Sequence, residues 1–217
     1  MCLPGLLAQA WKDKPVAAWT EDDARVVMAE SPWVKSVTPE GGGTAGPSKA
    51  KRVESVLGQM GGVRMGRMGM PGPRRMPSGR PEGPREQRAS VVTVRWESAL
   101  PVREAELKAR DTSAPTVDDG FYVLAVYRLP RDAVRAGMEK KLAKLGVLRR
   151  DGMKDLQAAR VRVLAREDGP VVVYLFSRTE GIRESDRRVE FSGEVSKWTV
   201  GAAFFTEDMR FGGKLEI

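Results

Sequence analysis

The sequence contains no histidine and only one cysteine, Cys2. Without histidine, the commonest general base and zinc ligand is missing, and no Ser/His or Cys/His catalytic pair can form. A single cysteine permits neither an intrachain disulfide nor a cysteine metal cluster. No run of about 18 apolar residues occurs, so we expect no membrane-spanning helix. These absences predict a protein that is not an enzyme and that has no catalytic residues, no metal site and no cofactor.

Positive charge is concentrated in one segment of the chain. The 217 residues carry a formal net charge of +8. Residues 41–90 hold ten Lys and Arg against three Asp and Glu, a net +7, so the remainder is close to neutral. A basic segment of this kind can attract anionic partners. The candidate contacts with an anionic surface are Arg64, Arg67, Arg74, Arg75, Arg80, Arg85 and Arg88.

The same segment contains twelve glycines and six prolines and lacks sustained apolar periodicity. Such a composition cannot bury enough surface to offset chain entropy, so we expect residues 39–90 to form a disordered loop. The Gly61–Gly66 spacing resembles a phosphate-binding loop, but Arg67 and Met68 replace the required Lys and hydroxyl residue. No aromatic residue lies between Val34 and Arg95, and binding of single-stranded nucleic acid usually combines basic groups with stacking aromatics. The composition favours an inert spacer over attachment to an anionic envelope polymer or lipid surface, and disfavours nucleic acid.

Residues 1–10 resemble the end of a signal peptide. Leucines precede Ala8-Gln9-Ala10, a small-x-small pattern of the kind that signal peptidase cleaves, although a basic n-region is missing. We expect a remnant of an export signal, with the true start upstream. An uncleaved N-terminus of a cytoplasmic protein is the alternative.

Residues 11–38 predict a short helix followed by a strand. Thr20 is a suitable N-cap with Asp23 three residues later, and Pro32 ends the helix. A helix of this length is not stable alone, and three exposed indoles would form an apolar patch. We therefore expect Trp11, Trp19 and Trp33 to dock on the later domain, with residues 33–38 pairing antiparallel to residues 91–97.

Residues 91–217 predict an α+β domain with a mainly antiparallel sheet and two or three helices, on which the N-terminal helix docks. The apolar run at 121–129 is typical of a central strand buried on both faces. Helices are expected near residues 98–110 and over 130–145. The expected strands are 91–97 and 121–129, the hairpins 160–165 with 171–178 and 187–195 with 197–205, and a short last strand in the tail.

Few side chains in this domain suggest chemistry. Glu180, Glu184 and Asp186 alternate with arginines and could bind a divalent cation or act as acid and base, but a solvated loop with mutually neutralising charges is favoured. Asp118-Asp119-Gly120 indicates a turn rather than a metal site. The aromatic residues Phe204, Phe205 and Trp198 are expected in the core rather than in a ligand platform.

Several motifs together suggest a relationship. They are Trp19-Thr20 with Ser31-Pro32-Trp33, then Arg95–Ala99, and an ending with Asp208-Met209 and Gly213–Glu216. As a set they resemble a group of uncharacterised secreted bacterial proteins, mostly acidobacterial. The resemblance covers both expected ordered parts and skips the loop. It assigns no functional residue and implies an exported, periplasmic or secreted, envelope-associated location.

These observations lead to one main functional hypothesis. We expect an exported, non-enzymatic domain that binds or scaffolds a component of the cell envelope, either an anionic polymer or another envelope protein. The alternatives are a carboxylate-dependent envelope hydrolase and a cytoplasmic protein that binds nucleic acid through its basic loop.

Overall fold

The structure, a computed structural model, describes residues 10–41 and 91–217. Both ranges belong to one compact unit. The expected signal-peptide remnant lies outside the described residues apart from Ala10, and so do the seven arginines of the expected anionic contact. The expected disordered loop also lies outside them, except for residues 39–41.

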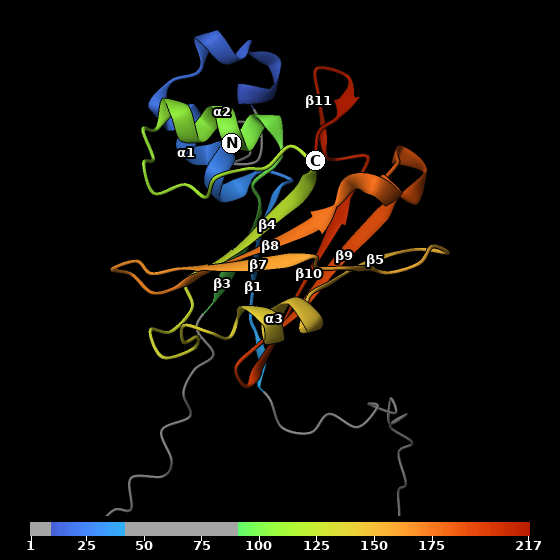
Figure 1. The fold of residues 1–217 in the computed structure, drawn as a ribbon. Helices are drawn as coiled ribbons and strands as arrows, with labels where there is room; N and C mark the ends of the chain where they lie inside the picture. The colour runs from blue at the N-terminus through green and yellow to red at the C-terminus, as the bar shows by residue number, and fades with distance from the viewer. Residues whose placement is uncertain (1–9, 42–90) are drawn as a thin grey trace, which may run out of the picture. The chain divides into compact units, whose positions relative to one another are not determined.

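The described residues form two five-stranded antiparallel sheets with three α-helices, which confirms the α+β fold (Figure 1). The first sheet has the order β1-β3-β4-β8-β7, with strands Val34–Val37, Val92–Trp96, Phe121–Tyr127, Val171–Ser177 and Arg160–Leu164. The second has the order β2-β10-β9-β5-β6, with strands Glu40–Gly41, Trp198–Phe205, Arg188–Val195, Val147–Arg150 and Leu156–Gln157. A separate hairpin joins β11, Arg210–Phe211, to β12, Lys214–Leu215.

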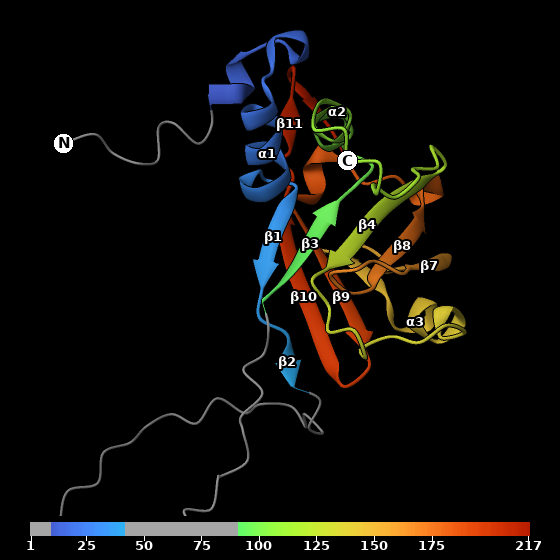
Figure 2. The same ribbon diagram turned by 90° about the vertical axis from the view of Figure 1, so that its left-hand side faces the viewer.

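Two of the passages from one sheet to the other are short corners. β1 leads through Pro39 into β2 (Figure 2), and β6 leads through Ala158 and Ala159 into β7. Corners of this kind let two sheets share one core while their strands cross. Glu40 and Gly41 pair with β10, so regular structure extends into the first residues of the segment that we expected to be a loop.

Aromatic side chains from both sheets meet in this core. The ring of Trp96 on β3 lies 5.2 Å from that of Phe204 on β10, measured between centroids. Tyr174 and Phe176 on β8 lie 5.0 and 6.4 Å from Phe191 on β9. All five rings are buried. Burying each such side chain contributes about 1.5–3 kcal/mol, so these contacts hold the two sheets together.

The N-terminal segment packs on the later domain, as predicted. Trp11, Trp19 and Trp33 are buried. β1 pairs antiparallel with β3, with Val34 opposite Arg95. The indole rings pack against one another and, in the case of the first two, against Phe211 of β11. The tryptophans therefore tie the two ends of the chain together.

Helix α1, Glu21–Glu30, begins with the predicted capping box. The Thr20 hydroxyl accepts a hydrogen bond from the Asp23 backbone N–H, and the Asp23 carboxylate accepts one from the Thr20 N–H. The hydrogen bond from the Thr20 backbone and the ammonium of Lys14 lower the pKa of Asp23 to about 2. α1 packs beside α2, Leu100–Lys108, at one end of the sheets (Figure 1).

The helix predicted over residues 130–145 is wrong in its first half, because α3 spans only Glu139–Leu145. Gly137 has φ of +88°, a left-handed conformation that interrupts helical continuity. Ala133 and Val134 are buried without being helical. Their apolar spacing therefore reflects a loop packed on the core rather than a helix face.

The remaining predicted elements are present. The hairpins β7–β8 and β9–β10 form as expected, and β4 is a central strand buried on both faces. β4 ends at Tyr127 rather than at residue 129, because Arg128 has φ of +59°. Short 3-10 turns span Ala10–Asp13, Val16–Ala18, Arg178–Glu180 and Glu184–Asp186. No helix in the described part of the chain is long and apolar enough to cross a lipid bilayer.

Candidate functional site

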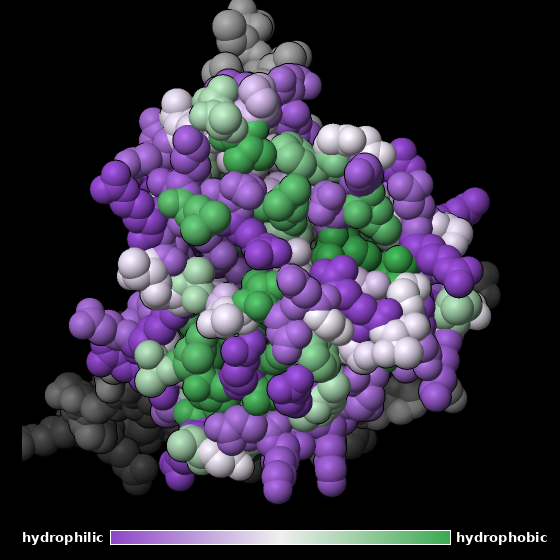
Figure 3. Space-filling view, turned by 45° about the horizontal axis from the view of Figure 1, so that its top comes forward, coloured by the Kyte–Doolittle hydropathy of each residue, from purple (hydrophilic) through white to green (hydrophobic). Residues whose placement is uncertain are grey.

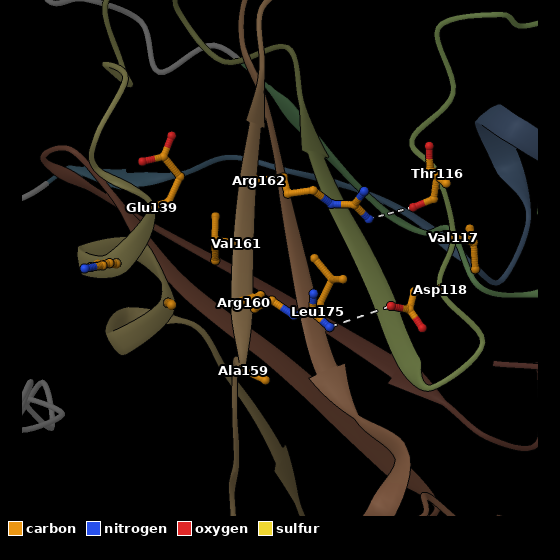
Figure 4. Close-up of a pocket in the computed structure, with 11 residues that line it drawn as sticks. Thr116, Val117, Asp118, Glu139, Ala159, Arg160, Val161, Arg162 and Leu175 are labelled. Atoms are coloured by element: carbon orange, nitrogen blue, oxygen red, sulfur yellow. Dashed lines mark hydrogen bonds and ion pairs between the residues drawn. The ribbon is translucent and has the colours of Figure 1, made fainter.

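The terminal strand β7 of the first sheet lies in a hollow of the described surface. β8 pairs with one side of β7, and within residues 10–41 and 91–217 no strand pairs with the other side. Helix α3 and the loop before β4 flank the strand (Figure 4). The backbone N–H and C=O groups along an unpaired strand edge are available to a further chain.

A pocket of about 670 Å³ lies along this strand. Four consecutive residues of the chain, Ala159–Arg162, line it. Because successive strand side chains point to opposite faces, a pocket lined by consecutive residues includes the strand's edge. The opposite walls are α3 and residues Thr116–Asp118. Figure 4 shows β7 between these two walls.

A second pocket of about 590 Å³ continues past the far end of β7. It shares Glu139 of α3 with the first pocket and is lined by Val163, Arg166 and Gly169 among others. A third pocket of about 300 Å³ shares Thr116 and Arg162 with the first. We name the first two pockets together the β7 groove.

The groove has an apolar floor and cationic sides. Val117, Ala143, Val161 and Leu175 provide apolar surface in the first pocket. The charged residues that line its two pockets are Arg131, Lys140, Arg160, Arg162 and Arg166 against Asp118, Glu139 and Glu167. A few polar groups over an apolar floor are typical of a ligand site.

Apolar side chains also reach the surface outside the β7 groove. On the face seen in Figure 3, hydrophobic side chains lie in separate groups divided by hydrophilic ones. Among the large apolar residues, Leu107 and Met153 are more than half exposed, but they lie on different elements. Single exposed apolar residues are ordinary on a protein surface.

A second polar feature is a buried cluster on the outer side of the first sheet. Arg95 of β3 donates from Nε to Glu97 Oε1 at 2.8 Å and from Nη2 to Glu106 Oε1 at 2.6 Å. The Tyr127 hydroxyl accepts from Arg95 Nη2 at 2.7 Å and donates to Glu97 Oε1 at 2.6 Å. We name these four residues the Arg95 cluster. It links α2 to β3 and β4.

Burial and close contact within the Arg95 cluster shift the pKa values of three of its members. Burial, together with the charge of Glu97 and a hydrogen bond to it, raises the pKa of Glu106 to about 9 against the opposing effect of Arg95. The raised pKa favours the protonated, neutral form of Glu106. Burial opposes the charged form of Arg95, but Glu97 and its neighbours outweigh burial and raise the pKa of Arg95. Burial and the charge of Glu97 raise the pKa of Tyr127.

The Arg95 cluster has the groups for acid–base chemistry but not the access. Glu97 is fully buried, and its Oε2 has no hydrogen-bond partner among the described residues. Neither Glu97 nor Glu106 lines any of the four described pockets. The Arg95 cluster therefore has a structural role: it holds α2 against the first sheet.

The carboxylates singled out from the sequence pair with arginines. Glu180 and Asp186 lie 3.6 and 3.8 Å from Arg150, and Glu184 contacts Arg210. Asp186 and Arg150 are buried, so this part of the loop is not solvated as expected. Within the described ranges, no group of three potential ligands is placed to hold a metal ion.

The other residues singled out from the sequence have structural roles or lie at the surface. The Asp118 carboxylate accepts from the Gly120 N–H at 3.1 Å, which confirms the turn. Phe204 is buried as predicted, whereas the side chain of Phe205 is 43% exposed and Trp198 is only partly buried. The expectation that all three belong to the core is therefore correct for Phe204, correct in part for Trp198, which packs against the core, and wrong for Phe205.

Sequence reasoning missed the β7 groove and the Arg95 cluster. The alternation Arg160-Val161-Arg162-Val163 carries a signal for the groove, because polar residues at every second position indicate a strand with one solvated face. No local signal brings Arg95 of a strand next to Glu106 of a helix.

No family model, curated protein or solved structure matches this chain. The resemblance to secreted bacterial proteins therefore stays a prediction.

Proposed function

We propose that the protein is a non-enzymatic binding domain that holds an extended polypeptide segment in the β7 groove. The observation that carries this proposal is the edge of β7, which lies inside a groove and pairs with no described strand. An extended peptide can add to such an edge through main-chain hydrogen bonds, while flanking pockets select its side chains.

The dimensions support this mode. β7 has five residues, which corresponds to roughly 16 Å of extended chain. The two pockets follow its length and share Glu139 at their junction. The groove therefore offers a continuous path with room for a segment rather than for a single small molecule.

The location and partner form part of the proposal. The small-x-small pattern at Ala8–Ala10 and the resemblance to secreted proteins support export to the periplasm or beyond. The partner is then another envelope protein that supplies the segment. The net +7 of residues 41–90 supports a separate, weaker attraction to an anionic envelope polymer.

The experiment compares two substitutions on one helix. Lys140 and Lys141 are adjacent exposed residues of α3, and only Lys140 lines a described pocket. Lys140→Trp should fill the first pocket, whereas Lys141→Trp makes the same chemical change outside it. The probe is a displayed library of extended ten-residue peptides.

The proposal expects peptides to be selected by the native protein and by Lys141→Trp, and to be lost with Lys140→Trp. Circular dichroism and thermal unfolding establish that both variants are folded. Selected peptides that bind both variants equally would place the binding site outside the β7 groove.

A further inference from the structure

Two arginines occupy alternate positions on β7. Arg160 and Arg162 project from the same face of the strand, and Figure 4 shows both side chains directed toward Thr116–Asp118. Residues two apart on a strand are separated by roughly 6.6 Å. The groove therefore presents two guanidinium groups that repeat with the period of an extended chain.

Neither guanidinium is strongly neutralised. Arg160 lies 3.7 Å from Asp118, and the two side chains are 62% and 48% exposed, so solvent screens this ion pair and weakens it. Arg162 donates from Nη2 to the Thr116 carbonyl at 2.7 Å, and its buried Nε has no acceptor among the described residues. Both arginines retain capacity to bind an anion.

The remaining cations of the groove support the same conclusion. Arg131 donates to the Glu167 carbonyl at 2.5 Å, and Arg166 donates to the Ser113 carbonyl. A carbonyl oxygen satisfies a donor without cancelling its charge. Five cations thus face three carboxylates across the groove, which is complementary to an acidic ligand.

From this arrangement we infer that the β7 groove selects an extended peptide with acidic residues at every second position. This inference rests on the proposed function. Carboxylates two residues apart in an extended peptide have the same repeat of roughly 6.6 Å as Arg160 and Arg162. Each can form charge-assisted hydrogen bonds with one guanidinium, and Arg can bind a carboxylate with two parallel bonds. The intervening side chains meet the apolar floor.

The experiment measures the affinities of four defined probes by isothermal titration calorimetry at low and high salt. The first is a ten-residue peptide that alternates Glu and Thr. The second has the same composition with its five glutamates in one block. The third alternates Gln and Thr, and the fourth is polygalacturonate, an anionic polysaccharide. We expect the first peptide to bind at least about tenfold more tightly than the second and third, and its affinity to fall as salt rises.

Two double variants with the same change in charge test whether Arg160 and Arg162 bind the peptide. Arg160→Gln combined with Arg162→Gln should weaken binding of the alternating Glu–Thr peptide at least about tenfold. Arg25→Gln combined with Arg149→Gln removes the same charge from exposed residues on α1 and β5 and should change affinity less than about twofold.

The outcomes separate this inference from the proposed function. Equal binding of the Glu–Thr and Gln–Thr peptides, both lost with Lys140→Trp, would overturn the acidic preference and keep the peptide groove. Equal binding of the block peptide would overturn the alternate spacing. No binding of any peptide, or polygalacturonate binding that is tighter than that of any peptide and is lost with Lys140→Trp, would overturn both.

Discussion

The indole Nε1 of Trp33 donates a 2.6 Å hydrogen bond to the backbone carbonyl of Glu216, 183 residues further along the chain. The Trp33 side chain is fully buried against Trp11. This contact joins the N-terminal segment to the C-terminal end of the compact unit.

Replacing Trp33 by Ala should destabilise the protein by about 3–5 kcal/mol, because it removes a large buried ring and leaves a cavity. Trp33→Phe keeps most of the ring but loses the hydrogen bond to Glu216, so its cost should be smaller. Urea unfolding measures both free energies. A change below about 0.5 kcal/mol for Trp33→Ala would mean that the side chain is exposed in solution.

The Arg95 cluster predicts a specific pH dependence of stability. The pKa of Glu106 is raised from 4.5 to about 9 in the folded protein. Between these values the folded state holds a proton that the unfolded state releases. The stabilising contribution is therefore complete below about pH 4.5 and is lost as pH rises toward 9.

Glu106→Gln should remove this contribution, since the amide is neutral at every pH. The free energy of unfolding of the native protein minus that of Glu106→Gln should fall as pH rises from 5 to 9, by at most about 1.4 kcal/mol per pH unit. Glu104→Gln, at a partly exposed residue of the same helix, is the control and should leave the pH dependence unchanged. A difference that rises with pH would show that Glu106 is ionised in the folded state.

Two glycines with positive φ, one beside the β7 groove and one away from it, differ in the space available to an added Cβ. Gly169, in the turn between β7 and β8, has φ of +126°, and an added Cβ would lie 2.3 Å from the Leu129 carbonyl oxygen. Gly152 has φ of +71°, and its added Cβ would meet nothing within 4 Å.

Gly152→Ala should cost about 1–2 kcal/mol, from the left-handed conformation alone. Gly169→Ala should cost at least twice as much, because the turn must also move away from Leu129. Thermal and chemical unfolding of the two variants gives the comparison. Equal costs would mean that the β7–β8 turn relaxes freely around the added methyl group.

The structural features that depend on residues close together in the sequence were predictable. The Thr20–Asp23 capping box depends on residues three apart, and the hairpins depend on alternation beside turn residues. Docking of the three tryptophans follows from the free-energy cost of exposing them. The pairing of β1 with β3 then follows as the simplest antiparallel arrangement.

The features that depend on tertiary placement were not predictable. The spacing of Val134 and Met138 suits a helix face, but the same spacing occurs in a loop that packs on the core and is interrupted at Gly137. The alternation at Arg160–Val163 predicts a strand, but it does not predict that this strand lies at the edge of its sheet. The position of β7 beside α3 depends on the corner at residues 158–159, which carries no turn signal.

Replacing residues 42–90 tests whether the compact unit folds without them. β2 and β3 flank this segment, and β1, which precedes β2, pairs directly with β3, with Val37 opposite Val92. Replacing residues 42–90 by a short Gly/Ser linker should therefore leave the fold and the midpoint of thermal unfolding unchanged or slightly raised, since each halving of a loop saves about 0.6 kcal/mol of closure entropy. Loss of cooperative unfolding in the shortened protein would show that this segment contributes structure.

The same shortened protein separates the groove from the basic segment. Binding of the alternating Glu–Thr peptide should survive the replacement, whereas any binding to an anionic polymer through the arginines of residues 64–88 should be lost. Calorimetry on both proteins measures this. Loss of peptide binding in a folded, shortened protein would move the binding site out of the β7 groove.

Amide hydrogen exchange of the full chain, with and without the alternating Glu–Thr peptide, tests the central claim most directly. An added segment that lies along β7 should protect the backbone amides on the unpaired side of residues 160–164 at least about tenfold. The amides of β10, which lie between two strands of the second sheet, should exchange at unchanged rates. Unchanged exchange along β7 in protein saturated with bound peptide would contradict the account.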